Sequence, residues 1–263
     1  WKPCLFIDQD GHAHVIYSDT SGAEVYYARM GSVGVSSAWA TPRVIDNASG
    51  LYAPLSMIVH REGTGWYVHA LDMNTSGSTL GILHRQIPVL ADGTYAGTIP
   101  TADTVASATS ADLVCLGIDF HHTAADVTAT ADSAPHLYVA WIHGADLKFV
   151  KATYSAGTWS WGTTRILDSS LPGSYGRGSM IFYGERVLVV ARIADSSPAC
   201  KLWERDAADT TTTARAIASV TIECPAVTYD GNGDVWIIGD DDRGSGGNIL
   251  YKVYDRSAGT WGT

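Results

Sequence analysis

The sequence predicts an all-β protein made of about five similar units, each of four short strands. Short runs of β-branched and aromatic residues recur along the whole chain, with turn residues between them. No segment sustains the i, i+3, i+4, i+7 apolar spacing of an amphipathic helix. The third observation is an internal repeat, because similar segments at a fixed period indicate a repeat architecture.

The repeat begins with three copies of one segment. A short apolar run ends in Asp8, Asp119 and Asp230, and each of these aspartates lies 111 residues after the one before it. Turn residues then lead to two further apolar runs, which we expect to be the second and third strands of a unit. The second runs are His14–Tyr17, Leu137–Trp141 and Val235–Ile238, and the third runs are Glu24–Tyr27, Asp146–Phe149 and Asn248–Tyr251. The pentapeptide Ser-Ala-Gly-Thr-Trp follows unchanged at residues 155–159 and 257–261.

A second type of unit alternates with the first. Its first strand contains Ser-Met-Ile, at residues 56–58 and 179–181, and a glycine-containing turn leads on to another strand. Matching lead-in segments precede it, Trp39–Asp46 and Trp161–Asp168. Two units of roughly 55 residues thus fill each period, which is close to the length of a propeller blade. The sequence therefore predicts a single β-propeller domain of about five four-stranded blades.

The predicted blades cover residues 1–46, 47–112, 113–168, 169–222 and 223–263. The last blade is expected to be incomplete, because Gly262 and Thr263 alone follow Trp261, whereas the matching segment after Trp161 runs on through Arg165 to Asp168. We also expect a processed product or a part of a longer protein, because the sequence opens at Trp1 without an initiator methionine.

Composition and motifs exclude several classes of function. Acidic residues outnumber basic ones by 27 to 17, and the formal net charge is −10, so we expect no nucleic-acid partner. No apolar run approaches the roughly 20 residues of a membrane-spanning helix, so we expect no membrane insertion. The four cysteines form no Cys-x-x-Cys pair, and no phosphate-binding loop, dinucleotide fingerprint or Gly-x-Ser-x-Gly elbow occurs. We therefore predict neither a metal site nor another cofactor.

Two short motifs indicate a family resemblance. Residues 8–17 read Asp-x-x-Gly-x-x-His-Val-x-Tyr, and Tyr-Tyr-Ala-Arg occupies residues 26–29. Together with the Ser-Ala-Gly-Thr-Trp turns, they resemble degenerate BNR or Asp-box repeats of sialidase-like β-propellers. The resemblance implies a propeller fold. It leaves the activity open, because that family includes sialidases, polysaccharide lyases and non-catalytic glycan-binding and phage surface proteins.

One face of the predicted propeller carries the candidate site. The loops after each second strand and the connections between blades emerge there, and ligands usually bind near the axis of that face. Carboxylates, arginines, a histidine and tyrosines fall on it, and such groups hydrogen-bond to sugars or stack on them. The predicted ligand-binding residues are Asp19, Tyr52, Asp72, His143, Tyr175, Arg177, Asp240, Asp241 and Arg243.

The opposite face carries histidines and aspartates that we do not expect to bind metal. The pairs His12/His14 and His121/His122 lack the spacing of a zinc motif. The segment Asp230–Asp234 imitates the start of a calcium loop, but its Asn-Gly step is explained by a tight turn.

The sequence gives weak support for catalysis. An enzyme would draw its catalytic groups from Asp19, Asp72, Asp240, His143, Tyr175 and Arg177. The arginine triad of a sialidase is not evident, and no glutamate occupies a corresponding loop as the acid of a glycosidase. A lyase base with a partner for a uronate can be drawn from His143, Tyr175 and Arg177, but their spacing does not single them out.

We therefore predict a non-enzymatic binding or structural propeller. It is expected to be a glycan-binding protein or a surface or virion component, such as part of a phage capsid, fibre or tail. Its location is expected to be extracellular, on a cell surface or on a virion. Its partner is expected to be a glycan or another protein of a larger assembly. The alternative is a carbohydrate-active enzyme, a polysaccharide lyase or a glycosidase, with its site in the propeller funnel.

Overall fold

The computed structural model of the chain describes most of the sequence in separate ranges. These are residues 3–8, 10–19, 24–32, 39–47, 53–62, 65–76, 79–89, 98, 101–108, 113–121, 136–155, 158–171, 178–183, 186–193, 200–206, 212–217, 222, 225–240 and 248–262. Every element in them is a β-strand. Among the described residues, no helix has the length and apolar character needed to cross a lipid bilayer. The chain divides into two compact units, Trp1–Ala111 and Asp112–Thr263.

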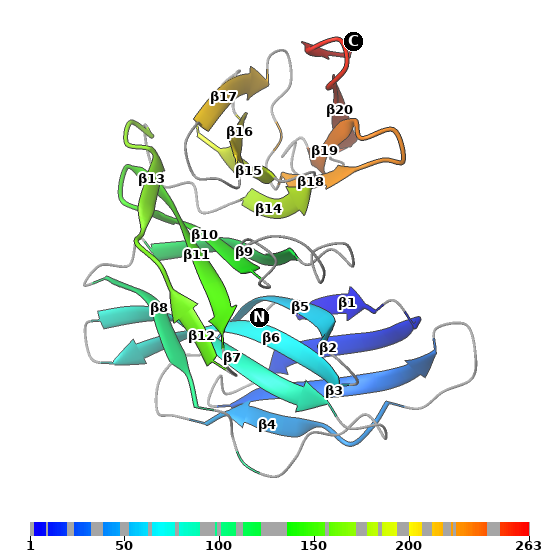
Figure 1. The fold of residues 1–263 in the computed structure, drawn as a ribbon, viewed down its shortest axis with the longest axis vertical. Coiled ribbons are helices and arrows are strands. Elements are labelled where there is room, and N and C mark those ends of the chain that lie inside the picture. The colour runs from blue at the N-terminus through cyan, green and yellow to red at the C-terminus, as the bar shows by residue number, and fades with distance from the viewer. Residues whose placement is uncertain are drawn as a thin grey trace. The chain divides into compact units, whose positions relative to one another are not determined.

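The first unit contains two four-stranded antiparallel sheets in which consecutive strands are neighbours. The first sheet consists of β1 (Cys4–Ile7), β2 (His12–Ser18), β3 (Val25–Ser32) and β4 (Arg43–Asp46). The second consists of β5 (Ala53–Glu62), β6 (Gly65–Ser76), β7 (Thr79–Val89) and β8 (Asp103–Ala108). Figure 1 shows the strands coloured in chain order, from blue at β1 to red at the C-terminus.

The second unit contains three antiparallel sheets. The first comprises β9 (Leu113–His121), β10 (His136–His143), β11 (Asp146–Ser155), β12 (Thr158–Trp161) and β13 (Arg165–Asp168). The second comprises β14 (Gly178–Tyr183), β15 (Arg186–Arg192), β16 (Cys200–Asp206) and β17 (Thr212–Ile217). The third comprises β18 (Ala226–Tyr229), β19 (Val235–Asp240), β20 (Ile249–Asp255) and β21 (Thr260–Trp261). Each of the five predicted blade ranges thus contains one sheet.

The outer edges of the sheets differ from one sheet to the next. In the first sheet of the second unit, β12 and β13 both pair with β11. The first sheet of the chain repeats this pattern, with a bridge from Met30 to Trp39 and then β4 on β3. The last sheet has the two-residue β21, whose Trp261 pairs with Tyr254. No described strand in that sheet corresponds to β4 or β13, but β18 to β21 form a four-stranded sheet, so the incompleteness of the last blade stays a prediction.

Neighbouring sheets within each unit pack through apolar faces. In the first unit, the side chains of Ile16, Val25, Tyr27 and Ile45 meet those of Met57, Val59, Val68, Ala70 and Ile87. In the second unit, one core joins Tyr138, Phe149, Phe182, Val189 and Trp203, and another joins Val190, Leu202, Ile217, Val235 and Ile237. Alternate residues of each strand enter these cores, because successive side chains in a strand point to opposite faces.

Two aspartates of the 111-residue repeat, Asp8 and Asp230, close hairpins, whereas Asp119 lies within β9. Asp8 Oδ1 accepts hydrogen bonds from the backbone N–H groups of Asp10 at 2.9 Å and His12 at 2.8 Å. Asp230 Oδ1 does the same for Asn232 at 2.8 Å and Asp234 at 3.1 Å. These aspartates therefore have a structural role at the turn between the first and second strands.

The second oxygen of each aspartate contacts a side chain of the following strand. Asp8 Oδ2 lies 3.0 Å from His14 Nε2 and 3.0 Å from His12 Nδ1, and Asp230 Oδ2 accepts from Trp236 Nε1 at 3.1 Å. Both histidines of the His12/His14 pair are thus hydrogen-bonded to a carboxylate. The resemblance to Asp-box repeats stays a prediction.

A buried glutamate joins three arginines in the second unit. Glu204 on β16 is 3% exposed and accepts from Arg186 at 2.9 Å, Arg215 at 2.8 Å and Arg256 at 3.0 Å. The three cations come from β15, from β17 and from the residue after β20. This cluster therefore ties the last two sheets together.

Candidate functional site

The structure describes four of the nine predicted ligand-binding residues. Tyr52, Tyr175, Arg177, Asp241 and Arg243 lie outside the described residues. Asp19 follows β2, and Asp72 lies within β6 of the same unit. His143 and Asp240 end β10 and β19 of the second unit. Asp240 is exposed, Asp19 and His143 are half-buried, and Asp72 is fully buried.

Asp72 belongs to a buried cluster between the two sheets of the first unit. Arg85 Nε on β7 donates to Asp72 Oδ2 at 3.0 Å, and Arg85 Nη2 donates to Asp46 Oδ2 through a short hydrogen bond. Asp46 ends β4 of the neighbouring sheet. All three residues are buried, with exposed fractions of 2% for Asp46, 0% for Asp72 and 6% for Arg85. One guanidinium group therefore holds two buried carboxyl groups, which we call the carboxyl pair.

The carboxyl pair holds a proton near neutral pH. Burial raises the pKa of Asp72 from 3.8 to about 7, and the guanidinium of Arg85 opposes this rise. The charge of Asp46 and a hydrogen bond between the two carboxyl groups raise the Asp72 pKa further. With one shared proton the carboxyl pair and Arg85 sum to zero charge, whereas two ionised carboxylates would leave a buried negative charge.

The internal repeat shows that this cluster replaces apolar residues. Across three neighbouring strands of the first unit, Met57 pairs with Ala70 and Ala70 pairs with Arg85. In the second unit, the equivalent Met180 pairs with Val189 and Val189 pairs with Trp203. Arg85 therefore corresponds to Trp203. By the same register, Asp72 corresponds to Ala191, a buried apolar residue.

The aspartate of the lead-in segment is common to both copies. Asp46 pairs with Val25 beside a bulge, and Asp168 pairs with Leu147 beside an equivalent bulge. In the second unit, Trp203 Nε1 donates to Asp168 Oδ2 at 3.1 Å. Ser170 also donates to Asp168, and Lys201 lies 3.5 Å from it, so the partners of this aspartate differ from those of Asp46. The extra charges at Arg85 and Asp72 are not needed for packing, because buried ion pairs seldom stabilise a fold more than apolar residues of similar volume do.

The opposite face of the same strands shows a second polar replacement. His69 on β6 and His84 on β7 correspond by register to Leu188 and Leu202. His69 Nδ1 lies 2.8 Å from His84 Nε2, and His84 Nδ1 lies 3.6 Å from a carboxylate oxygen of Asp103. Burial lowers the pKa of His84, so its ring is neutral at pH 7. Two buried histidines thus connect to a half-exposed carboxylate.

Two stacked tyrosines lie on the first sheet of the same unit. The rings of Tyr17 and Tyr26 are stacked with centroids 5.5 Å apart, and both side chains are half-buried. The Tyr26 hydroxyl donates to Glu24, and this hydrogen bond raises the pKa of Tyr26 to about 12. The backbone N–H of Asp19 donates to the carbonyl of Glu24 at 3.2 Å. Aromatic rings beside carboxylates are a common lining of sugar sites.

Sequence reasoning found Asp72 but missed its partners. The sequence predicts Asp46 as part of a lead-in segment and not as a site residue, and it makes no prediction for Arg85, His69 or His84. The signal was present in the sequence, since aligning the second and third strands of the two Ser-Met-Ile units places polar residues opposite apolar ones.

Solved structures share this fold at low sequence identity. No protein-family model matches the sequence, and no curated protein matches it. The GH43_1 enzyme from Xanthomonas citri complexed with xylose is 12% identical with a TM-score of 0.51, over 99% of this chain and 89% of that chain. The endo-arabinase from Bacteroides thetaiotaomicron is 11% identical with a TM-score of 0.52, over 95% and 92%. A putative 6-phosphogluconolactonase from Bacteroides uniformis is 13% identical with a TM-score of 0.58, over 98% and 69%.

These likenesses define the class of fold. The chain is an all-β protein with the fold of a five-bladed β-propeller, which confirms the predicted fold class. They contradict the predicted function. The expectation of a non-enzymatic binding or structural propeller is wrong, because proteins that share the fold include a xylose-bound GH43_1 enzyme and an endo-arabinase. The alternative of a carbohydrate-active enzyme accounts for these findings better.

Proposed function

We propose that this chain is a carbohydrate-active enzyme that cleaves glycosidic bonds, and that Asp72 holds the proton received by the leaving oxygen. The observation that carries the proposal is the carboxyl pair, in which the pKa of Asp72 is raised to about 7. A carboxylic acid that keeps its proton at neutral pH is what general acid catalysis requires. The enzymes that share the fold support the proposal. The partner would be a glycan, which suits a location outside the cell.

The proposed step is common to hydrolysis and elimination. As the bond from the sugar carbon to the leaving oxygen breaks, that oxygen takes the proton of Asp72, and the carboxyl pair becomes doubly ionised beside Arg85. In a hydrolase, water then adds to the anomeric carbon and releases a proton, whereas in a lyase a base removes a ring proton and a double bond forms. Either route returns one proton to the carboxyl pair at the end of the cycle.

The carboxyl pair fills one role of the two that a glycosidase needs. The paired carboxyl groups of glycosidases are about 5 to 5.5 Å apart in retaining enzymes and about 6.5 to 9.5 Å apart in inverting ones. One guanidinium, that of Arg85, donates to both Asp46 and Asp72, so we treat the carboxyl pair as a single acid. Because Asp72 is fully buried, a substrate oxygen reaches its proton only after the groups that cover it are displaced.

Product analysis tests the proposal. The protein is incubated with arabinan, xylan and polygalacturonate, and mass spectrometry distinguishes products that have gained water from unsaturated products. Wild type is expected to cleave one of these classes, with a rate that falls as the pH rises above about 7. Asp72→Asn is expected to lower the rate at least 100-fold, since general acid catalysis contributes about 10² to 10⁴.

Asp168→Asn is the matched control, because Asp168 corresponds to Asp46 in the second unit and lies outside the proposed site. It should leave the rate within about twofold of wild type. Equal losses in the two variants, or full activity in Asp72→Asn, would overturn the assignment of Asp72.

A further inference from the structure

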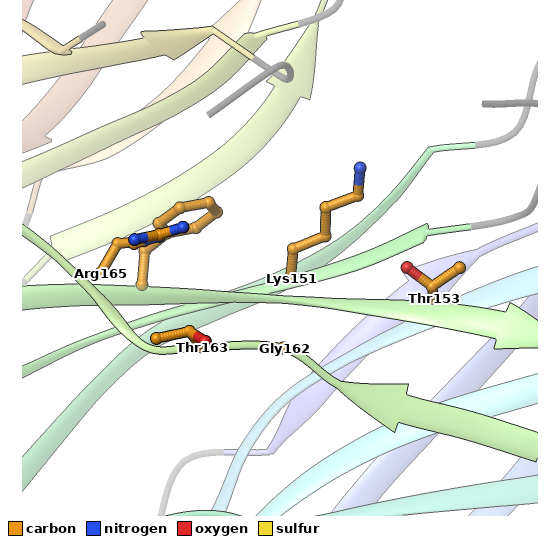
Figure 2. Close-up of a pocket in the computed structure, with 6 residues that line it drawn as sticks. Lys151, Thr153, Gly162, Thr163 and Arg165 are labelled. Atoms are coloured by element: carbon orange, nitrogen blue, oxygen red, sulfur yellow. The ribbon is translucent and has the colours of Figure 1, made fainter. Parts of the chain in front are cut away.

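A small pocket lies on the first sheet of the second unit, whereas the carboxyl pair belongs to the first unit. It encloses about 200 Å³ and is lined by Phe149, Lys151, Thr153, Gly162, Thr163 and Arg165. Figure 2 shows Lys151 and Thr153 on one strand, β11, Thr163 on the segment that follows β12, and Arg165, which begins β13. Pockets for drug-sized ligands enclose about 300 to 1,000 Å³. This pocket therefore fits a single sugar ring.

The lining has the chemistry of an anion site. Lys151 and Arg165 are cationic, Thr153 and Thr163 carry hydroxyl groups, and none of the lining side chains is acidic. Arg165 is exposed and Lys151 is half-buried, so both cations are accessible. A further guanidinium, of Arg205, lies 5.5 Å from the ring of Phe149. This concentration of positive charge stands out in a protein whose formal net charge is −10.

Backbone packing keeps the pocket narrow. Gly162 donates its N–H to the carbonyl oxygen of Lys151 at 2.8 Å. A Cβ atom at Gly162 would lie 3.1 Å from that oxygen, which is tighter than ordinary contacts. The glycine therefore lets the segment that carries Thr163 and Arg165 lie close against β11.

The internal repeat places cations at the same positions in the first unit. Phe149 pairs with Arg165, and the equivalent Tyr27 pairs with Arg43. Ala40 donates its N–H to the carbonyl of Arg29 at 2.8 Å, as Gly162 does to Lys151, so Arg29 corresponds to Lys151. Both complete copies of this segment thus carry two cations in equivalent places.

We propose that the pocket at Lys151 and Arg165 binds an anionic sugar residue, bearing a carboxylate or a sulfate ester, of a polysaccharide chain. The guanidinium group of Arg165 suits a planar or tetrahedral oxyanion, Lys151 adds a second charge-assisted hydrogen bond, and the threonine hydroxyls suit sugar hydroxyls. The pocket holds a chain without cleaving it. Binding here therefore does not depend on the proposed reaction.

Affinity electrophoresis tests the site with three polymers: polygalacturonate for the carboxylate, dextran sulfate for the sulfate ester, and dextran as the neutral control. Wild type is expected to be retarded by at least one anionic polymer, less so at high salt, and not by dextran. Lys151→Ala is expected to weaken this binding about fivefold. The anionic polymer that responds identifies the source of the anion.

Lys148→Ala is the matched control, because it removes the same charge from the same strand at a residue paired with Asp146 outside the pocket. It should change the affinity less than twofold. Equal weakening by both variants, equal retardation by dextran, or no retardation by either anionic polymer would overturn the proposal. The outcome is separable from the proposed function, since Asp72→Asn should abolish cleavage and leave this retardation unchanged.

Discussion

The substitution Asp72→Asn tests whether the carboxyl pair holds a proton at neutral pH. Burial raises the pKa of Asp72 from 3.8 to about 7. One pKa unit corresponds to about 1.36 kcal/mol, so an ionised Asp72 costs the folded state about 4 kcal/mol. An asparagine side chain stays uncharged at every pH and can still donate a hydrogen bond to Asp46. The variant is therefore expected to escape this cost.

Proton counting gives the direction of the pH dependence. Between pH 3.8 and about 7, the folded protein keeps a proton on Asp72 that the unfolded chain has released. The free energy of unfolding therefore falls as the pH rises across this window. The stabilising contribution of the protonated form is complete below pH 3.8 and is lost as the pH rises through about 7. From pH 5 to pH 8, wild type should lose about 3 kcal/mol relative to the variant.

Urea denaturation at pH 5, 6, 7 and 8, followed by tryptophan fluorescence, measures this difference. The stability gap between variant and wild type is expected to widen by about 3 kcal/mol in favour of the variant. Asp168→Asn provides the control. Burial raises the pKa of Asp168, but hydrogen bonds from Ser170 and Trp203 bring it below 3.8. The difference in unfolding free energy between Asp168→Asn and wild type should therefore stay constant from pH 5 upward. A constant gap for Asp72→Asn would refute the reasoning.

Three further changes test other parts of the account. Asp72→Ala combined with Arg85→Trp copies the apolar pattern of the second unit. The free energy of unfolding of this double variant in urea should lie within about 2 kcal/mol of wild type, whereas Arg85→Ala alone should lower it by about 3 to 5 kcal/mol. Glu204→Gln leaves three arginines around an uncharged amide, and calorimetry should show a loss of about 2 to 3 kcal/mol. Burial raises the pKa of Asp8, but hydrogen bonds from His14 and His12 bring it below 3.8. Asp8→Asn should therefore destabilise the fold at pH 7, with a deficit that shrinks as the pH falls below 3.8 in acid titration.

The fold was predictable because the repeat leaves a strong mark in the sequence. Asp8 and Asp230 close equivalent hairpins, and Trp159 and Trp261 occupy equivalent places in outer strands. A fixed spacing in the sequence therefore corresponds to equivalent sheets in the fold. The pairing of both β12 and β13 with β11 was not predicted. It depends on a bulge at Leu147 that no residue pattern specifies.

The candidate site was predictable in part. Asp72 was found because it follows the apolar run of a second strand, but its burial depends on the neighbouring sheet, which the sequence does not place. Asp46 and Arg85 are 39 residues apart in the chain and meet through sheet packing. Local spacing cannot reveal such a contact. Comparing Arg85 with Trp203 in the other copy does reveal the position, because a charge in place of a buried apolar residue marks a special role.

The most direct test of the central claim compares the cleavage of polysaccharide by wild type and by the double variant Asp72→Ala, Arg85→Trp. The double variant removes the proton donor but keeps a partner for Asp46, as Trp203 is for Asp168. The melting temperatures of both proteins are measured alongside, so that a loss of cleavage is not mistaken for a loss of folding. Wild type is expected to give cleaved glycan products and the double variant none. Cleavage at the wild-type rate by the double variant would contradict the central claim.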